Sequence, residues 1–549
     1  MRPIDARTLP DGTVLDGEIV VVGAGAAGIT LALELVRLGR EVLLVEGGGL
    51  DPDPDLQALH EVESTGFAMR PDYLPRLRQL GGTCNLWAGR AMRLLPDDFL
   101  ARPAVPDGAW PFPYRELEAL YPEAERLLGL PGPGAFDADR WLVRASAAER
   151  ALLASGELRP TVSLWAVRPR RFFRDFRREL VAHPRLRLLI RAQACRLRQD
   201  PTGRRVLGVE LRVLDGPRLE ARGRHVVLAC GGLENARLLL LSTDRHPAGI
   251  GNEHDLVGRF FMDHPRAVWG RVELRPGVEL RLLRGRPVRG GKVQLGLALA
   301  PARRAMDGLL HHYATLESER SSYAREQYDL AVQLAKRVLR RGHAGGRFDL
   351  RGLFAGRTPD MVYLLTPKEI LPHPVYRLLW LVRERIPRRA RAERLVLVHF
   401  CEQPLDPESR VALSDRHDAL GLRMVRLHWR VQPEILASMR ALEQSIGVEL
   451  ASTGLGRCFP GEGEPRFTDA SHHMGTTRMG SDPRSSVTDA HGRVHGVENL
   501  WIAGSSLFPS GGHANPTLTI VALALRQARH LAALCDAPTI STRSTTAVA

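Results

Sequence analysis

A glycine-rich run near the N-terminus most constrains how this chain folds. Gly-Ala-Gly-Ala-Ala-Gly occupies positions 23–28, directly after the apolar, β-branched stretch 18–22. Residues 26–38 then carry apolar side chains at helical spacing, and a second apolar stretch, 41–45, ends at Glu46. Strand, glycine turn, helix and strand in this order predict a parallel βαβ unit.

Each glycine of this run has a mechanical role in a dinucleotide-binding turn. Gly23 permits the tight turn, Gly25 lets the backbone approach a pyrophosphate, and Gly28 allows the helix to pack closely on the strand. The pyrophosphate then lies at the helix N-terminus, where unpaired N–H groups favour an anion. Glu46 is placed to accept a hydrogen bond from a ribose 2′-hydroxyl, and its charge disfavours the 2′-phosphate of NADP.

Two further strand–turn–helix segments occur far down the chain. Residues 224–241 contain a Gly-Gly turn, and residues 499–534 contain a loop rich in glycine, serine and proline. Before the first of them, 186–197 and 206–213 are predicted as two strands. Segments so far apart predict one nucleotide-binding domain assembled from separate parts of the chain.

The chain is too long for one compact core, so we expect two domains. The predicted fold is a discontinuous α/β, Rossmann-like domain plus an α+β domain built around an antiparallel sheet. The predicted ranges are 1–105, 185–265 and 465–540 for the first domain, 106–184 and 266–464 for the second, and 541–549 for a disordered tail.

Composition excludes several classes of protein. No run of about 18 uncharged apolar residues and no apolar signal region is present, so we expect a cytoplasmic protein. The six cysteines form no Cys-x-x-Cys pair and the histidines show no metal-ligand spacing, so no metal site is predicted. The net charge is +15, but the arginines are spread along the whole chain, which indicates a solvated surface rather than a nucleic-acid site. The basic stretch 375–391 is the local exception: it could contact a membrane or an acidic partner, but we favour a helix packed on its own domain.

The nucleotide is predicted to be FAD rather than NAD. An NAD enzyme continues with βαβ units, whereas this chain breaks the pattern after Glu46. It continues through Gly-Gly-Gly-Leu-Asp-Pro-Asp-Pro-Asp to Arg-Gln-Leu-Gly-Gly-Thr-Cys-Asn-Leu-Trp-Ala-Gly-Arg at 78–90. A glycine-rich loop with an embedded tryptophan suits a cofactor buried under several loops.

These features together resemble the glucose-methanol-choline (GMC) oxidoreductases, FAD enzymes that act on alcohols. Besides the N-terminal run, the resemblance rests on ordered motifs at 78–90, 110–121, 229–237, 256–265, 402–411 and 472–480. The loop ending in Trp87 and the run Ala-Asn-Pro-Thr-Leu-Thr at 514–519 are similar to the branch that contains pyranose oxidase.

The resemblance implies a catalytic pair. The family's catalytic histidine falls on His472, which opens His-His-Met-Gly-Thr-Thr-Arg-Met-Gly, and its second catalytic position falls on Asn515. The imidazole would accept the hydroxyl proton while the hydride passes to flavin N5. Two alternatives remain open: His473 in place of His472, and a capping role for Asn515 at the helix near Thr517.

Other residues receive supporting roles. His513 is a candidate substrate contact, and His264 is expected to pack between the domains. The resemblance implies flavin contacts at Gly23, Gly25, Gly28, Glu46, Gly82, Thr83, Asn85, Ala194, Gly504, Ser505, Asn515 and Thr517. Gly504 stands where the family usually has an aspartate, and Leu86 stands where the pyranose oxidase branch can attach FAD to a histidine. We therefore expect FAD to be bound without a covalent link.

The predicted function is FAD-dependent oxidation of an alcohol to an aldehyde or ketone. A sugar, a polyol or a glycosylated metabolite is the expected substrate, with O2 or another electron acceptor. The alternatives are flavin-dependent desaturation or other C–H oxidation, and a membrane-associated dehydrogenase subunit.

Overall fold

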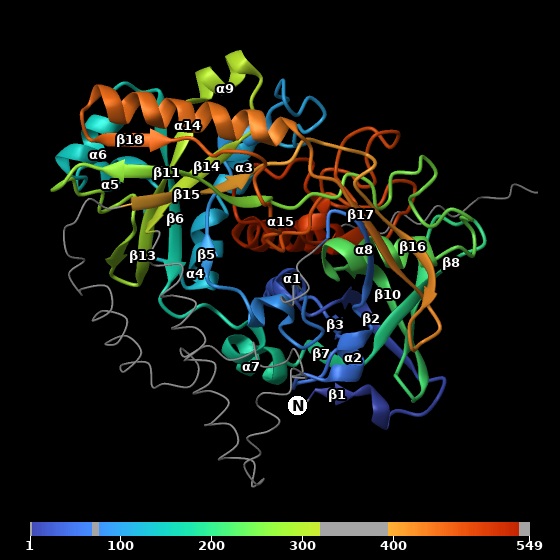
Figure 1. Cartoon of the computed structure of the whole chain (residues 1–549). Coiled ribbons are helices and arrows are strands. Elements are labelled where there is room, and N and C mark those ends of the chain that lie inside the picture. The colour runs from blue at the N-terminus through green and yellow to red at the C-terminus, as the bar shows by residue number, and fades with distance from the viewer. Residues whose placement is uncertain (1–2, 69–75, 319–393, 537–549) are drawn as a thin grey trace, which may run out of the picture.

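A mixed eight-stranded sheet carries the N-terminal glycine turn (Figure 1). The structure, a computed structural model, describes residues 3–68, 76–318 and 394–536. The strand order is β1-β7-β3-β2-β10-β9-β8, and β19 also pairs with β10. The pairs β1–β7, β7–β3, β3–β2, β2–β10 and β10–β19 are parallel, while β9 pairs antiparallel with β10 and β8. The bounds are β1 (Ile4–Asp5), β2 (Val14–Val22), β3 (Val42–Val45), β7 (Leu186–Ile190), β8 (Gln193–Gln199), β9 (Val206–Arg212), β10 (Arg218–Leu228) and β19 (Leu500–Ile502).

Helices pack on this sheet because its central strands are apolar on both sides. All four residues of β3 are buried, and so are Ile19–Val22 of β2. Helix α1 (Ala26–Arg37) packs against α15 (Thr517–Asp536) and α7 (Phe172–Ala182). The other described helices are α2 (Pro54–Ala58), α3 (Tyr114–Glu118), α4 (Tyr121–Leu128), α5 (Ala138–Leu142), α6 (Ala147–Leu152), α8 (Gly231–Leu241), α9 (Pro301–Asp307) and α14 (Glu434–Ser452).

A second sheet is antiparallel and supports the other half of the molecule. Its order is β18-β11-β15-β14-β13-β6-β5, with β12 paired to β13. Helix α14 lies across it and contacts β13, β14, β15 and β18 (Figure 1). The bounds are β5 (Arg90–Ala91), β6 (Leu158–Ala166), β11 (Arg266–Leu274), β12 (Arg286–Val288), β13 (Gly291–Leu299), β14 (His312–Ser318), β15 (Arg394–Cys401) and β18 (Gly456–Phe459). The predicted combination of a Rossmann-like α/β part and an antiparallel α+β part is confirmed.

A small third sheet joins segments far apart in the chain. The hairpin of β16 (Arg410–His417) and β17 (Arg423–Trp429) pairs in parallel with β4 (Val62–Gly66) and packs on α8. One sheet thus combines strands from both ranges assigned to separate domains, and the proposed domain boundaries remain a prediction. The stretch 375–391 and the tail 541–549 lie outside the described residues.

The prediction of one strand over 186–197 is wrong. Arg191 takes a left-handed backbone conformation with φ of 59°, which ends β7 at Ile190. The chain turns there, so β7 pairs in parallel with β3 while β8 pairs antiparallel with β9. Apolar periodicity alone does not reveal such a turn, because the side chains on both sides of it are buried.

Helix α15 is long and apolar enough, by length and composition, to cross a membrane. Two thirds of its most apolar 18-residue window is buried inside the protein, where α1 and α4 pack against it. Core helices of soluble proteins pass the same test, so this helix is weak evidence for a membrane span.

Candidate active site

A cavity of about 810 Å³ opens where the parallel strands of the first sheet end. Gly23 follows β2, Glu46 follows β3, Gly231 lies just beyond β10, and Gly504 lies just beyond β19; all four line the cavity. In open α/β sheets, ligands bind outside the carboxyl ends of the strands. The topology therefore gathers the separate nucleotide-binding segments at one edge of the sheet.

The three glycines of the first turn meet different surroundings. Gly23 has φ of +101°, and a Cβ there would lie 2.6 Å from the Ala229 oxygen. A Cβ on Gly28 would lie 1.9 Å from the Gly23 oxygen, so the helix and the turn pack too closely for a side chain. A Cβ on Gly25 would meet nothing within 4 Å and would project into the cavity. Of the three glycines, Gly23 and Gly28 thus allow close packing within the protein, whereas Gly25 leaves open space for a ligand.

Glu46, directly after β3, has its carboxylate buried against backbone donors. Its oxygens accept hydrogen bonds from the N–H of Ala24 at 2.8 Å and of Gly48 at 2.7 Å. Burial raises the pKa of Glu46, and these donors and Arg78 act in the opposite direction. Each oxygen keeps a second lone pair, so the carboxylate can still accept from a ribose hydroxyl.

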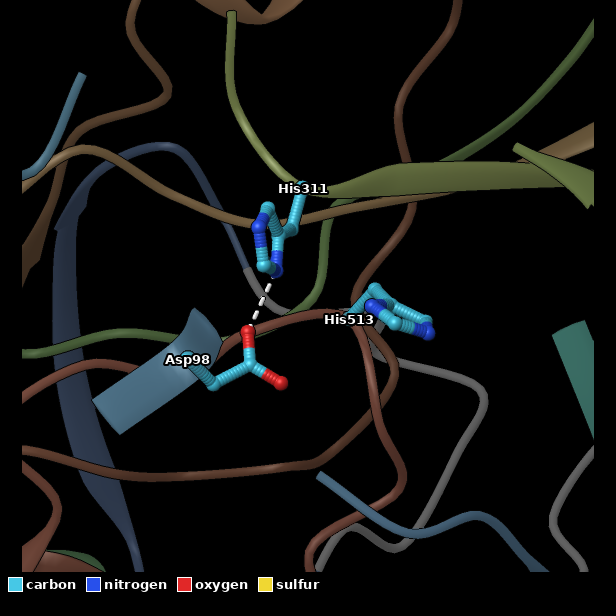
Figure 2. Close-up of side chains that lie close together, drawn as sticks. All are labelled: Asp98, His311 and His513. Carbon is cyan, nitrogen blue, oxygen red and sulfur yellow. Dashed lines mark ion pairs between the residues drawn. The ribbon is translucent and has the colours of Figure 1, made fainter. Parts of the chain in front are cut away.

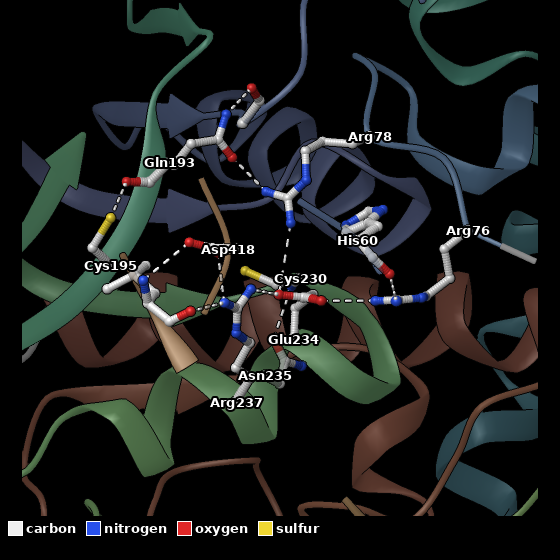
Figure 3. A network of polar contacts seen from close by, with 12 residues as sticks. His60, Arg76, Arg78, Gln193, Cys195, Cys230, Glu234, Asn235, Arg237 and Asp418 are labelled. Atoms are coloured by element: carbon white, nitrogen blue, oxygen red, sulfur yellow. Dashed lines mark hydrogen bonds and ion pairs between the residues drawn. The ribbon is translucent and has the colours of Figure 1, made fainter. Parts of the chain in front are cut away.

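Buried charges border the same part of the cavity, where Arg76, Arg78 and Arg237 surround Glu234 (Figure 3). Arg76 donates to Glu234 at 2.7 Å, and Arg237 donates to Asp418, in the turn between β16 and β17, at 2.7 Å. Although burial acts to raise it, the neighbouring arginines hold the pKa of Glu234 well below its ordinary value. This network ties the turn after β10 to the loop at 76–78 and to the third sheet.

The remaining predicted cofactor residues fall into two groups. Gly82, Thr83, Ala194, Ser505 and Thr517 line the cavity. Gly28 and Asn85 do not line it; Asn85 Nδ2 donates to the Leu80 oxygen at 3.0 Å and so holds its own loop together. The open cradle at Gly25, the Glu46 acceptor and the converging strand ends fit a bound dinucleotide such as FAD.

His472 and Asn515 meet at the wall of this cavity. His472 Nε2 lies 3.2 Å from Asn515 Nδ2, and both residues line the cavity. Ser471, immediately before His472, has φ of 59°, a strained conformation for a residue with a side chain. Burial, with the nearby His264, lowers the pKa of His472 well below its ordinary value, so the imidazole is neutral.

The capping alternative for Asn515 does not match its contacts. A cap would accept a helix N–H through its side-chain oxygen. Asn515 Oδ1 has no hydrogen-bond partner among the described residues, while its Nδ2 faces His472. The amide is therefore directed at the histidine and the cavity rather than at the first turn of α15.

His473 and His513 take other positions. His473 also lines the cavity, but its ring packs against Phe261, and burial lowers its pKa to about 3. His513 is not part of the cavity wall; it packs edge-on against Tyr313, and burial lowers its pKa to about 4. Of the two adjacent histidines, His472 is the one bonded to Asn515.

Sequence reasoning missed the role of His264. It was expected to pack between the domains, but its Nδ1 lies 2.9 Å from His472 Nδ1. Asp263 Oδ1 accepts the backbone N–H of both His264 and His472, at 2.6 Å and 3.1 Å. The adjacent Asp-His pair at 263–264 was the available signal, but its partner lies more than 200 residues away.

Asp98, His311 and His513 place potential ligand atoms within 4.8 Å of one another (Figure 2). His311, however, lies between two carboxylates: its Nε2 is 3.1 Å from Asp97, and its Nδ1 pairs with Asp98. These carboxylates raise the pKa of His311 against the effect of burial, which makes it a cation. The ion pairs around His311 balance three negative charges with three positive ones. The negative charges are those of Asp97, Asp98 and Glu402, and the positive ones are those of Arg102, Arg304 and His311. We therefore interpret this cluster as an ion-pair network rather than a metal site.

Comparison with known proteins connects the site to a family. A family model described as GMC oxidoreductase matches residues 406–524, the part that carries His472 and Asn515. The chain is 28% identical to 6'''-hydroxyparomomycin C oxidase of Streptomyces lividus, across 94% of this chain and 91% of that protein. It is 26% identical to the fructose dehydrogenase large subunit of Gluconobacter japonicus, across 94% and 97%. Pyranose 2-oxidase of Tricholoma matsutake is 43% identical, but over only 14% of either chain.

A solved structure shares the fold across nearly the whole chain. Formate oxidase of Aspergillus oryzae superposes with a TM-score of 0.55 at 18% identity, covering 96% of this chain and 99% of that one. FAD is the cofactor typical of the GMC oxidoreductases. Residues 406–524 are thus similar to the GMC oxidoreductases, and over nearly its whole length the chain is 25% to 28% identical to oxidases and dehydrogenases of alcohol groups; it is an oxidoreductase that acts on CH–OH groups.

Proposed function

We propose that this protein oxidises a hydroxyl group of a sugar, a polyol or a glycosylated metabolite to an aldehyde or ketone. The observation that carries the proposal is the contact of 3.2 Å between His472 and Asn515 on the wall of the dinucleotide cavity. A neutral imidazole beside a side-chain amide can take a hydroxyl proton and hold the oxygen in place.

His472 is available as the base because burial lowers its pKa, which keeps the imidazole unprotonated. The substrate hydroxyl donates to Nε2, and Asn515 Nδ2 turns from the imidazole to donate to the same oxygen. Asn515 has an unpartnered Oδ1 among the described residues, so its amide is not committed to other contacts. FAD, when bound, supplies the hydride acceptor. The protein contributes by holding the carbinol against that acceptor in one orientation.

The cavity wall around this pair supports a hydroxyl-rich substrate. Trp87 and Phe400 line the cavity and contribute aromatic surface suited to contact with the C–H groups of a sugar ring. Arg90 lies 4.4 Å from the Phe400 ring centroid and donates to Ser163 at 3.0 Å. Its Nε has no hydrogen-bond partner in the parts of the chain that the structure describes, so a donor is left for a substrate oxygen.

Relatives with full-length similarity support the same substrate class. Their names assign them to hydroxyparomomycin, paromamine and fructose. The proposed likeness to the pyranose oxidase branch rests on a shorter region, since pyranose 2-oxidases match 14% to 23% of this chain. We therefore place the substrate among carbohydrates without restricting it to free pyranoses.

An anaerobic reduction experiment tests the proposal. The holoenzyme is mixed with a panel of sugars, polyols, aminoglycosides and simple alcohols, and the bleaching of the flavin absorbance is followed. We expect rapid bleaching with at least one carbohydrate and formation of one carbonyl per flavin reduced. Bleaching by none of the alcohols would overturn the proposal. Admission of air to the reduced enzyme then distinguishes an oxidase, which reoxidises at once, from a dehydrogenase.

The absence of a covalent flavin link is a separate expectation. Leu86 occupies the cavity wall with a side chain that cannot form a bond to the isoalloxazine. Acid precipitation of the purified protein should leave the flavin in the supernatant, where its absorbance is measured. Flavin retained in the pellet would contradict this, and would point to one of the nucleophilic side chains of the cavity, such as His60, Cys84 or His473.

A further inference from the structure

We propose that His264 is a positioning residue that fixes which nitrogen of His472 is free to accept the substrate proton. The inference rests on the proposed function, because it deepens the role of the same base. It starts from a chain of three contacts: the Gly512 oxygen, His264, and His472.

The contacts run through opposite nitrogens of the His264 ring. His264 Nε2 lies 3.0 Å from the Gly512 oxygen and 3.4 Å from the Gly511 oxygen. His264 Nδ1 lies 2.9 Å from His472 Nδ1, and the two rings stand nearly perpendicular at 79°. Only 1% of His264 is exposed to solvent. Water therefore does not compete for either nitrogen.

The carbonyl determines where the proton of His264 lies. A carbonyl oxygen can only accept, so His264 Nε2 must carry the hydrogen. Burial lowers the pKa of His264, so the ring is neutral and its Nδ1 holds a lone pair. A lone pair can only accept, so His472 Nδ1 must carry the hydrogen of that contact. In a neutral His472, Nε2 is then the bare nitrogen that faces the cavity.

The third member of the site agrees with this assignment. A bare Nε2 on His472 requires a donor from Asn515, and the amide nitrogen is the atom that faces it, at 3.2 Å. If His264 carried its hydrogen on Nδ1 instead, the lone pair of Nε2 would face the lone pairs of the Gly511 and Gly512 carbonyl oxygens. One backbone carbonyl thus sets two imidazole tautomers and one amide orientation.

Buried contacts hold that carbonyl in place. Gly512 has φ of +52°, and its N–H donates to Glu402 Oε1 at 3.0 Å. A Cβ on Gly512 would lie 2.7 Å from Asp98 Oδ1, so the loop lies directly on the ion-pair network. Glu402 is fully buried and also pairs with Arg102 at 2.6 Å. The loop cannot rotate its carbonyl away from His264 without breaking these contacts.

Two variants of His264 distinguish a positioning role of its acceptor nitrogen from a role as a space-filling side chain. His264→Leu removes the acceptor, whereas His264→Asn retains an acceptor oxygen close to the position of Nδ1. At saturating substrate, we expect His264→Leu to lower the rate of anaerobic flavin reduction about 100-fold, with KM changed less than threefold. We expect His264→Asn to restore the rate to within about tenfold of the original enzyme.

A matched control tests whether the loss of any buried imidazole would lower the rate through destabilisation of the protein. His312→Leu removes a buried histidine that contacts His399 in the second sheet and does not line the cavity. It should lower thermal stability without lowering the rate of flavin reduction. Equal rate losses in His312→Leu and His264→Leu would overturn the proposal.

A spectroscopic readout tests the tautomer without relying on activity. In the 15N-histidine-labelled holoenzyme, the His472 signals, identified by their loss in His472→Gln, should show a protonated Nδ1 and a bare Nε2. His264→Leu should shift the signals towards the other tautomer, and His264→Asn should return them. An unchanged His472 spectrum in His264→Leu would overturn the inference. If no alcohol reduces the flavin but this pattern is observed, the proposed function fails and the positioning role stands.

Discussion

Replacing His472 with alanine is expected to lower the rate of flavin reduction by alcohol 10²–10⁴-fold, the range associated with loss of a general base. The imidazole lies 3.2 Å from Asn515 on the cavity wall, and no other described side chain offers a neutral base bonded to that amide. The rate is measured by anaerobic stopped flow, with FAD content checked by absorbance. A variant that retains FAD and reduces it as fast as the unsubstituted enzyme would refute the role of His472.

His473→Ala is the matched control for this experiment. The neighbouring ring also lines the cavity but packs on Phe261 and does not contact Asn515. We expect a loss of less than about tenfold, and a larger loss than in His472→Ala would transfer the base to His473.

The pH profile provides a further check on the base. The pKa of His472 is lowered by burial, so the neutral form should persist below pH 6.5, the ordinary histidine value. The rate should therefore stay flat as pH falls from 8 to about 6.5 and decline only at lower pH.

Replacing Glu402 with glutamine is expected to destabilise the protein by about 3–5 kcal/mol, because one partner of a buried ion pair is removed. Glu402 is fully buried and binds Arg102 through both oxygens, at 2.6 Å and 2.7 Å. It also accepts the backbone N–H of His311 and Gly512. The variant leaves the buried network around Arg102 with one positive charge in excess. Urea denaturation measures the change in the free energy of unfolding.

The exposed pair Glu279–Arg281 supplies the control. Its side chains are 59% and 63% exposed, so Glu279→Gln should cost less than about 1 kcal/mol. A cost for Glu402→Gln no larger than that of Glu279→Gln would show that the buried network does not contribute stability.

The effect of Glu402 should also depend on pH in a defined direction. Burial acts to raise the pKa of Glu402, but the charge and hydrogen bonds of Arg102 lower it below the ordinary value. A carboxyl with a lowered folded-state pKa contributes full stability above its unfolded pKa and loses it as pH falls through the folded value. The difference between the original protein and Glu402→Gln should therefore be largest near neutral pH and shrink below pH 4.

Much of the fold could be predicted because its signals are local. The glycine run at 23–28, the flanking apolar stretches and the acid at 46 each lie within one βαβ unit, where periodicity and turn chemistry act over a few residues. The pairing of β4 with β17 joins residues more than 350 positions apart, and no local sequence pattern predicts it. The left-handed conformation of Arg191 likewise escaped prediction, since an arginine carries no signal for a positive φ.

The same division holds within the active site. By itself, the sequence determined the nucleotide turn, the acid that follows β3 and, through the resemblance, the pairing of His472 with Asn515. Only the tertiary structure decided that His264 contacts His472, that Gly512 directs its carbonyl at His264, and that Glu402 holds that loop. The physical reason is the distance along the sequence over which each property is determined. Turn and strand preferences depend on neighbouring residues, whereas proton positions depend on which donor and acceptor atoms distant segments bring within hydrogen-bonding distance of each other.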